Sequence, residues 1–408
     1  MFLACHSELF TAGILLISIL LFMENHSITT AADKTSLTGM SWSMIGRIIL
    51  KAAFLFAIIN FLFAACRPID TLGSLSLYNY LFPGRLRLPY GEVPAKDYNL
   101  TLNNIPAMLA SHQWHHSQDN SFNVLLIGDS GTWGWFLDNE ETLSGQLNNL
   151  GLNADDGRPV VVYNLGYPVM SLMKDLMLLD NALEFASPDL ILWPVTMQSF
   201  AAQRQLDHPL LQENAATVRG LIEDYNLPLD PKDTRFVDRS FLQETLTGRR
   251  RDVADLLRLQ AWGLPWAATK KDQDIPNDIP LRKTDLDADE SWLDVEGQRP
   301  LTRDDLVFDI LAAGIERAGN VPVIVINEPI FISDGQNSDI RYNSFYPRWA
   351  YDQFRELMAM ESLQAGWRYI DLWKAIPPEE FTDTPVHLTP EGTRLLAGLI
   401  SEELGWQP

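Results

Sequence analysis

Two residues that could act together in nucleophilic catalysis stand in settings that suit this chemistry. Ser130 follows the apolar run 124–127, and His387 lies in a short segment ahead of the last helix-period stretch. A serine hydroxyl attacks poorly until a neighbouring base takes its proton, and an imidazole has a suitable pKa for that task. The base also needs an acceptor for its other nitrogen, and Asp383 is of the right type. The three residues indicate acyl transfer through an acyl-serine intermediate.

Acyl transfer also needs hydrogen-bond donors for the oxyanion of the tetrahedral intermediate. The backbone N–H of Ser130 is one candidate. Gly166 is another, because a loop without a side chain lets its amide approach a substrate closely. This chemistry requires no metal ion and no organic cofactor, and we expect none.

The elements that must position these residues follow an alternating pattern. Short apolar runs predict strands buried on both faces, and apolar residues at helical spacing predict helices between them. The predicted strands are 124–127, 160–164, 190–193, 321–326 and 369–372, and the predicted helices include 143–150, 172–183, 349–363 and 390–400. This order implies right-handed crossovers and a parallel sheet with helices on both faces. Ligands bind at the carboxyl ends of such strands, which is where Ser130 lies.

Capping residues mark two helix starts. Thr389 as N-cap and Pro390 at the first helical position predict the beginning of the final helix. Thr302 predicts the cap of a helix led by 304–305, which Gly319 ends. His387 is therefore expected in a short loop held by the packing of the helix that follows it.

Together these residues resemble the SGNH (GDSL-like) hydrolase superfamily. Gly128-Asp129-Ser130 matches its first block, Gly166 its oxyanion glycine, and Asp383 with His387 its last block in kind. The resemblance covers 121–202 and 305–408. It implies a three-layer α/β/α flavodoxin-like domain.

Two departures from the family pattern concern the site. The third block usually reads Gly-x-Asn-Asp, and Thr196 stands where the resemblance places the asparagine that supplies an oxyanion hydrogen bond. The Thr196 hydroxyl and the Gln198 amide are the candidate substitutes. If neither serves, the loss of one such donor typically costs about 100- to 1,000-fold in turnover. The family's aspartate stands three residues before its histidine, where this chain has Thr384, whereas Asp383 is four before His387. Either a loop absorbs the extra residue, or the enzyme works mainly as a Ser130–His387 pair.

Four further residues are candidates for substrate binding: Asp129, Asn164, Gln198 and Glu328. Simpler interpretations stand beside the functional ones. Asp129 and Ser130 are typical helix caps, Gly166 suits a turn, and Glu328 could form a structural ion pair. A histidine such as His387 is, taken alone, more often structural than catalytic.

Composition excludes several classes of function. The formal net charge is −22, which argues against nucleic acid and against binding to anionic lipid head groups by charge alone. The only cysteines are Cys5 and Cys66, so the folded part is expected to hold no disulfide and no thiolate metal site. A histidine cluster at 112–116 is interpreted as a solvated polar loop rather than a metal site.

Two apolar runs, 9–23 and 52–66, indicate membrane segments. Basic residues gather between the runs, so the positive-inside bias places the globular domain outside the cytoplasm. Three topologies are open: two spans, a single signal anchor with its start at Met40 or Met44, or cleavage at 63–66, which loosely resembles a lipoprotein box. The alternative to all three is a buried helical hairpin in a cytoplasmic protein.

The sequence divides into five parts. We expect membrane segments in 1–66, an extended collar in 67–120, and the α/β domain in 121–202 and 305–408. The remaining segment, 203–304, reads as an inserted helical cap with a solvated acidic loop at 272–296. Its tryptophans Trp262 and Trp266 are expected to pack on the main domain rather than lie in a membrane interface below Arg249–Arg251.

These observations favour a membrane-anchored, extracytoplasmic serine esterase or O-acyltransferase that acts on a small-molecule ester or on a glycan or lipid ester. Esters of envelope glycans or lipids are what the resemblance to membrane-anchored relatives implies. A catalytically inactive binding or scaffold protein of the same fold is the alternative. A nucleotide-binding module is disfavoured because no glycine-rich phosphate loop follows the first strand. The position of Ser130 relative to His387 discriminates between the first two.

Overall fold

The computed structural model describes residues 41–408 except 83, 92 and 118–119. The chain forms two compact units. In the described residues the first unit consists of 41–68 and 239–253, and the second of 69–238 and 254–408. The catalytic candidates all lie in the second unit.

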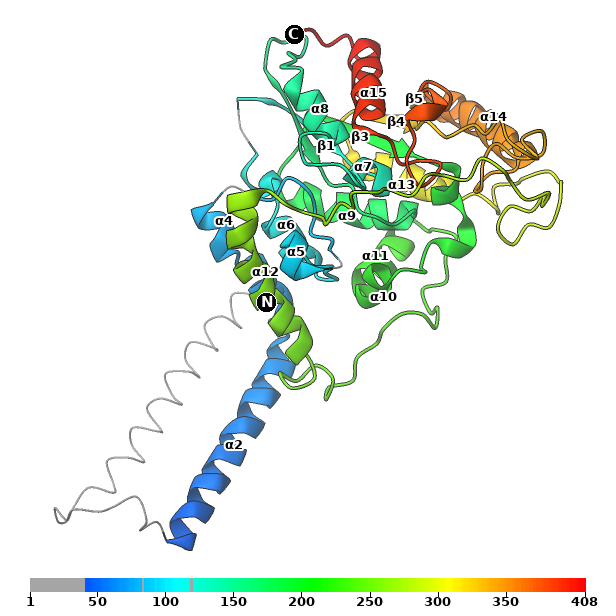
Figure 1. The fold of residues 1–408 in the computed structure, drawn as a ribbon. Coiled ribbons are helices and arrows are strands. Elements are labelled where there is room, and N and C mark those ends of the chain that lie inside the picture. The colour runs from blue at the N-terminus through cyan, green and yellow to red at the C-terminus, as the bar shows by residue number, and fades with distance from the viewer. Residues whose placement is uncertain (1–40, 83, 92, 118–119) are drawn as a thin grey trace. The chain divides into compact units, whose positions relative to one another are not determined.

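A five-stranded parallel sheet forms the centre of the second unit (Figure 1). Its strands are β1 (Phe122–Leu126), β2 (Val160–Asn164), β3 (Leu190–Val195), β4 (Val323–Asn327) and β5 (Arg368–Asp371). The strand order is β2-β1-β3-β4-β5, and all four pairings are parallel. This is the flavodoxin-like order, which reverses direction between β1 and β3. The predicted α/β class and parallel sheet are confirmed.

Helices cover both faces of the sheet, because successive residues of each strand point to opposite sides. Val124 and Leu126 join one apolar cluster with residues of α8 (Leu143–Asn149) and α15 (Pro390–Glu403). Leu125 joins the other cluster. That cluster includes residues of α9 (Leu172–Phe185), α13 (Phe308–Ala318) and α14 (Arg348–Ala365). The three-layer α/β/α arrangement is therefore present.

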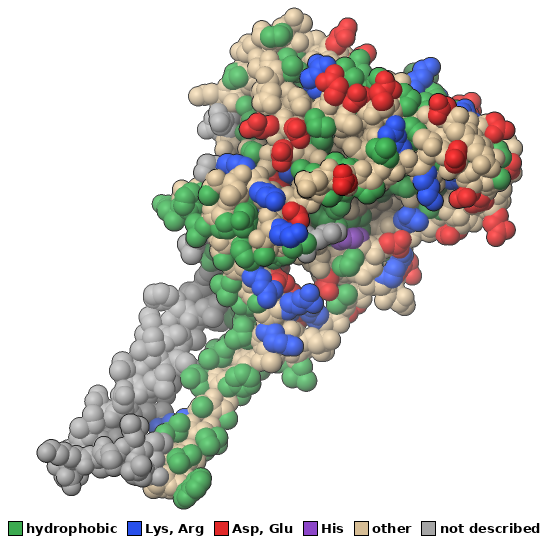
Figure 2. All heavy atoms as spheres, viewed as in Figure 1, with side chains coloured by type: hydrophobic (Ala, Val, Ile, Leu, Met, Phe, Trp, Pro, Cys, Tyr) green, Lys and Arg blue, Asp and Glu red, His purple; other side chains and the backbone are tan. Residues whose placement is uncertain are grey.

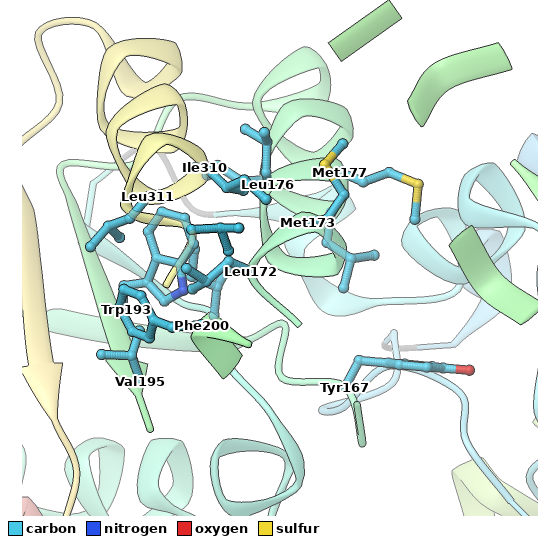
Figure 3. Packing of buried hydrophobic residues seen from close by; sticks show 14 of the residues in the cluster. Tyr167, Leu172, Met173, Leu176, Met177, Trp193, Val195, Phe200, Ile310 and Leu311 are labelled. Carbon is cyan, nitrogen blue, oxygen red and sulfur yellow. The ribbon is translucent and has the colours of Figure 1, made fainter. Parts of the chain in front are cut away.

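Trp193 of β3 is the largest side chain at the contact between the sheet and these helices (Figure 3). Its Nε1 donates to Asp175 Oδ2 of α9 at 3.2 Å. A Cβ at Gly314 of α13 would lie 2.4 Å from the indole ring, so this close approach requires glycine. The Trp193 ring thus contacts both α9 and α13 on the same face of the sheet.

Residues 67–120 are not an extended collar, and that prediction is wrong. They form the short helices α3 (Ile69–Ser74), α4 (Leu77–Leu81), α5 (Pro94–Asp97), α6 (Ile105–Ala110) and the 3-10 helix η1 (Gln113–His116). Leu100, Met108 and Trp114 join the main core. The apolar side chains of this segment are spaced irregularly between turn residues, so they gave no periodic signal. In short helices they are nevertheless buried in the core.

The histidine cluster is not a uniformly solvated loop either. His112 is buried, accepts from the Trp114 N–H at 3.0 Å, and has its pKa lowered to about 4 by burial. His115 and His116 are exposed. Within the described ranges, no group of three or more His, Cys, Asp or Glu residues could hold a metal ion.

The segment 203–304 contains the helices α10 (Pro209–Glu213), α11 (Ala215–Asp224) and α12 (Arg250–Thr269). Trp266 is fully buried, and Trp262 packs against the main core. The stretch 272–296 is not simply a solvated acidic loop, since Asp272 and Trp292 within it are buried.

One predicted helix start is wrong. The helix that Gly319 ends begins at Phe308 rather than after Thr302. The N–H and hydroxyl of Thr302 instead donate to Asp305 Oδ2 at 2.8 and 3.0 Å, which closes a separate turn. Arg299 also donates to the Asp305 carboxylate, so this aspartate serves the turn and not the first turn of α13.

The first unit contains α2 (Trp42–Cys66), which Ser41 caps. In the described ranges it is the one helix long and apolar enough to cross a membrane, with a mean hydropathy of 2.3. Exposed apolar side chains, such as Leu50, Phe54 and Phe61, are distributed along this helix, and Figure 2 shows apolar side chains on the face in view. The apolar run 9–23 lies outside the described residues.

Candidate active site

Ser130 is the first residue of α7 (Ser130–Trp133), which begins just beyond the carboxyl end of β1. Asp129 caps this helix: its Oδ1 accepts from the Gly131 N–H at 2.8 Å. Capping fixes the turn from strand to helix and leaves the Ser130 side chain half-buried. The nucleophile candidate is thus presented at the edge of the sheet where parallel folds bind ligands.

The structure brings Ser130, His387 and Asp383 together in one hydrogen-bonded chain. His387 Nε2 lies 2.8 Å from Ser130 Oγ, and its Nδ1 lies 2.8 Å from Asp383 Oδ1. The loop that carries both residues is closed by the Thr382 N–H, which donates to the His387 carbonyl at 2.8 Å. Thr389 then caps α15. The four-residue spacing of Asp383 and His387 is accommodated within this loop.

The charge state of Asp383 sets the direction of the chain. Partial burial raises its pKa, but the hydrogen bond and charge of His387 outweigh burial and hold the pKa below its ordinary value. The ionised carboxylate accepts the proton of Nδ1, which leaves the Nε2 lone pair for the Ser130 hydroxyl hydrogen. This is the arrangement that a general base requires.

Trp135 is a site residue that sequence reasoning missed. Its ring stacks on the His387 ring, with centroids 6.1 Å apart and an interplanar angle of 25°. The Trp135 N–H donates to the Ser130 carbonyl at 3.1 Å, so the same loop carries the serine and the ring that packs on the histidine. Its position five residues after Ser130 carries no recognised motif.

The loop after β2 does not supply the free donor expected of Gly166. The Gly166 N–H donates to Asn164 Oδ1 at 2.9 Å, and Asn164 Nδ2 donates to the Thr132 carbonyl at 2.8 Å. A Cβ at Gly166 would lie 2.5 Å from the Trp133 nitrogen. Asn164 is fully buried and ties this loop to α7 instead of facing a substrate. By contrast, the Ser130 N–H donates to no acceptor within the described part of the chain.

Thr196 and Gln198 follow β3 and are both buried. The Gln198 N–H donates to the Tyr346 phenol oxygen at 3.4 Å, and Thr196 neighbours the same phenol. Neither Thr196 Oγ1 nor Gln198 Oε1 makes a hydrogen bond of standard geometry to the residues that the structure describes. Two polar groups with unused hydrogen-bonding capacity therefore lie at the end of the strand beside β1.

Two buried carboxyl groups, those of Asp129 and Glu328, lie close to the turn that carries Ser130. Glu328 Oε1 and Asp129 Oδ2 are buried without a hydrogen-bond partner among the described residues. Burial raises the pKa of Glu328 well above its ordinary value, and the charges of Asp129 and Asp175 raise it further. Burial likewise raises the pKa of Asp129, against the charge of Lys174. Glu328 forms no ion pair with another described residue. Because Glu328 and Asp129 are both buried, neither carboxyl group faces an open substrate-binding surface.

Lys174 connects this buried cluster to the nucleophile turn. Its Nζ donates to the Gly128 carbonyl at 2.6 Å and to Asp175 Oδ1. Burial raises the pKa of Asp175 to about 6, although Lys174 acts in the opposite direction. The Lys174 side chain thus anchors the backbone at Gly128, two residues before Ser130.

We expect Glu328→Gln to remove part of the pH dependence of stability. With its pKa raised in the folded state, Glu328 holds a proton that the unfolded chain loses above about pH 4.5, so stability falls as pH rises beyond that value. The neutral amide abolishes this loss. Thermal unfolding from about pH 5 to 9 should show the variant gaining stability relative to the wild type as pH rises.

Glu356→Gln, at an exposed position of α14, is the matched control and should give a constant difference. A constant difference for Glu328→Gln as well would contradict a protonated Glu328.

Arg87 holds the loop 133–137, which follows Ser130 and includes Trp135, and was also missed by sequence reasoning. This buried guanidinium donates to the carbonyls of Gly134 and Leu137 at 3.0 and 3.1 Å. Its Nε donates to the buried Asp272 of the insertion at 3.0 Å. Its Cζ lies 4.4 Å from the centroid of the Trp133 ring. Charged donors of this kind make stronger hydrogen bonds than neutral ones.

Gln273, which follows Asp272 in the insertion, forms hydrogen bonds to the same loop. Its Nε2 donates to the Gly134 and Leu137 carbonyls at 2.9 and 2.8 Å, and its Oε1 accepts from the Phe136 N–H at 2.8 Å. The nucleophile loop is thus held by residues from the segment before β1 and from the insertion.

We expect Arg87→Lys to lower catalytic turnover without changing the charge of the site. Lysine lacks the planar fork that reaches Asp272 and the loop carbonyls together, and each buried carbonyl left unpaired costs about 1–3 kcal/mol. The resulting displacement of Trp135 and Ser130 should lower kcat by about 10- to 100-fold with a smaller change in KM. Steady-state hydrolysis of an activated acetyl ester measures both constants.

Arg394→Lys, on the exposed face of α15, is the matched control and should retain wild-type kcat. Wild-type kcat in Arg87→Lys would exclude a positioning role for Arg87.

No family model and no curated protein matches the chain. Solved structures that are similar include a G-D-S-L family protein from Desulfitobacterium hafniense DCB-2 (12% identity, TM-score 0.33, covering 70% of this chain and 99% of that one). They also include the lipase/acylhydrolase from Enterococcus faecalis (16%, 0.34, 70% and 97%). A third is Est24, a carbohydrate acetylesterase from Sinorhizobium meliloti (12%, 0.31, 69% and 98%). These three structures are what the chain is similar to among solved proteins.

Proposed function

We propose that this protein is a serine esterase or O-acyltransferase of the SGNH type. The observation that carries the proposal is the hydrogen-bonded chain from Ser130 Oγ through the His387 ring to Asp383, with 2.8 Å at each step. A nucleophile, a base and an orienting acceptor in this order suit acyl transfer. Ser130 is half-buried, so a carbonyl can approach its hydroxyl.

In the proposed reaction Ser130 Oγ attacks the ester carbonyl carbon while its proton passes to His387 Nε2. The tetrahedral intermediate collapses as the C–O bond to the alcohol breaks, and the alcohol oxygen takes the proton from His387. An acyl-Ser130 ester remains. Water or an acceptor alcohol then gives its proton to His387 and attacks the acyl carbon. The bond from the acyl carbon to Ser130 Oγ breaks, and His387 returns the proton to this oxygen, which releases an acid or a new ester and restores both residues.

The oxyanion donors in this proposal are the Ser130 N–H and the Thr196 hydroxyl, with Gln198 as the alternative at the same block. Thr196 Oγ1 makes no hydrogen bond of standard geometry to a described residue, whereas the unpaired atom of Gln198 is its acceptor oxygen Oε1, so Thr196 is the preferred donor. The Gly166 N–H already serves Asn164, so the role proposed for Gly166 is close backbone packing against α7. Preorganised donors of this type stabilise the developing negative charge without reorganising during the reaction.

The proposed setting is a membrane, with the globular domain outside the cytoplasm and esters of envelope glycans or lipids as substrates. Support comes from the length and hydropathy of α2 and from Arg47 and Lys51 near its first turns. The net charge of −22 is unfavourable for nucleic acid as a partner. The proposed reaction uses no metal or organic cofactor.

Ser130→Ala should abolish labelling by a fluorophosphonate probe, which forms a covalent bond only with an activated serine. The full chain in detergent is treated with the probe and analysed by in-gel fluorescence. Ser401→Ala, which alters a hydroxyl in α15 that donates to the Gly398 carbonyl, is the control and should label like the wild type. Labelling independent of Ser130, or none in the wild type, would favour an inactive binding or scaffold protein.

Thr196→Val should lower kcat by about 100- to 1,000-fold, because it removes a hydroxyl donor while keeping the shape of the side chain. Thr196→Ser restores the hydroxyl and should retain most of the activity. Hydrolysis of an activated acetyl ester provides the measurement. If Thr196→Val keeps wild-type kcat and Gln198→Leu loses it, Gln198 is the donor. If neither change lowers kcat, this block supplies no oxyanion donor.

A further inference from the structure

The first unit contains a polar contact within its apolar helix. Asn60 of α2 is buried, and its Nδ2 donates to the Phe56 carbonyl at 2.9 Å. Its Oδ1 accepts from both the N–H and the hydroxyl of Thr247, each at 2.9 Å. One amide side chain therefore ties the segment 239–251 to the side of α2. A polar residue in an apolar helix is expensive unless it is paired in this way.

A second contact lies beside the first. The rings of Phe61 and Phe241 are 5.5 Å apart, centroid to centroid. Next to this pair, Phe241 is 49% exposed and Leu242 is 77% exposed. The segment thus exposes two large apolar side chains beside an apolar helix. Such a surface is unfavourable if it remains in contact with water.

Part of the backbone on either side of these apolar residues is paired within the segment. The Glu244 N–H donates to the Ser240 carbonyl at 3.1 Å, and the Thr245 N–H donates to the Leu242 carbonyl at 3.4 Å. The Ser240 N–H and hydroxyl both donate to Gln243 Oε1, at 2.8 and 2.9 Å. Internal pairing of this kind lowers the cost of placing a non-helical backbone near hydrocarbon.

The position of Asn60 along α2 sets the depth of the contact. The stretch 48–66 spans about 28 Å at 1.5 Å per residue, close to the thickness of a hydrocarbon core. Asn60 lies about 9 Å along the axis from the last residue of the helix. When Arg47 and Arg67 reach the two head-group regions, Asn60 and Thr247 lie below the hydrocarbon boundary at the C-terminal end of α2.

The charges of the segment suit the boundary itself. Arg249 is paired with Glu244 at 3.0 Å and with Asp252 at 2.5 Å. Arg250 and Arg251 follow and are exposed. Long basic side chains can extend from the apolar boundary to lipid head groups while their stems remain among apolar atoms. Paired charges and extended arginines are therefore compatible with the interface between head groups and acyl chains.

We propose that the segment 239–251 is an interfacial clasp, which lies in the lipid leaflet at the C-terminal end of α2. Phe241 and Leu242 contact acyl chains, Arg250 and Arg251 lie among head groups, and Asn60 locks the segment to the helix. The occupant of this apolar surface is a lipid leaflet, to which α2 leads continuously. The inference rests on the membrane anchoring proposed above.

Site-directed spin labelling of the full chain in phosphatidylcholine nanodiscs tests the clasp. Single cysteines are introduced at Leu242, Phe54 and Leu281 in a Cys5→Ala, Cys66→Ala background and labelled with a nitroxide. Collision with oxygen, which partitions into lipid, is compared with collision with a water-soluble nickel chelate. Leu281 is the matched control because it is 75% exposed in the loop 272–296 of the second unit.

The clasp predicts an oxygen-to-nickel collision ratio at Leu242→Cys close to that at Phe54→Cys and well above that at Leu281→Cys. A lipid-like ratio at Phe54→Cys with a water-like ratio at Leu242→Cys would overturn the clasp and leave the anchor intact. A water-like ratio at Phe54→Cys would overturn both.

Asn60→Leu tests the lock separately. The change makes α2 more apolar, so the helix should stay in the bilayer and the ratio at Phe54→Cys should stay lipid-like. The ratio at Leu242→Cys should then shift toward the value at Leu281→Cys, because the two hydrogen bonds to Thr247 are lost. An unchanged ratio at Leu242→Cys would show that Asn60 does not hold the segment.

Discussion

One imidazole ring with a hydrogen bond on each nitrogen is the interaction on which the candidate site depends. His387 joins Ser130 and Asp383, and 257 residues separate His387 from Ser130 in the sequence. The sheet makes this meeting possible. β1 is an interior strand and presents Ser130 at its carboxyl end, while α15 packs beside α8 and positions the loop before it. The fold therefore acts mainly as a frame for two short loops.

Segments outside the α/β core hold these loops in place. Arg87, Asp272 and Gln273 fix the loop after Ser130. Arg282, farther along the insertion, performs the same task for the loop before His387. Its N–H donates to the Thr382 carbonyl at 2.7 Å, and its guanidinium donates to the Phe381 and Pro378 carbonyls at 2.8 and 2.7 Å. The stretch 272–282 of the insertion thus contacts both candidate catalytic loops and helps to position them, which its acidic composition does not suggest.

The sheet is the part of the fold that the sequence predicts best. A strand covered on both faces needs an unbroken apolar run, and the runs at 160–164 and 190–193 coincide with β2 and most of β3. Ser130, His387 and Asp383 could be selected because few residue types perform acyl transfer, and the order of the strands brings them together. Local capping is less secure. Thr302 has the residue type of a cap, but Asp305 three residues later offers its hydroxyl a competing partner.

The remaining site features depend on contacts that have no local signal. Arg87 and Asp272 are 185 residues apart, and each looks like a surface residue until the chain folds and buries both. The position of Glu328 after β4 is predictable, but its protonation depends on burial near Asp129, which only packing determines. The engaged Gly166 N–H is an exception, since an asparagine two residues earlier commonly accepts from such an amide.

The most direct test of the central claim is to trap the acyl-enzyme. The full chain is mixed with an activated acetyl ester, quenched in acid during turnover and digested, and the peptide that contains Ser130 is examined by mass spectrometry. The structure predicts one acetyl group on Ser130, formed in the wild type and at a greatly reduced rate in His387→Ala. Turnover without acetylation of Ser130, or equal acetylation rates in the two proteins, would contradict the proposed Ser130–His387–Asp383 mechanism.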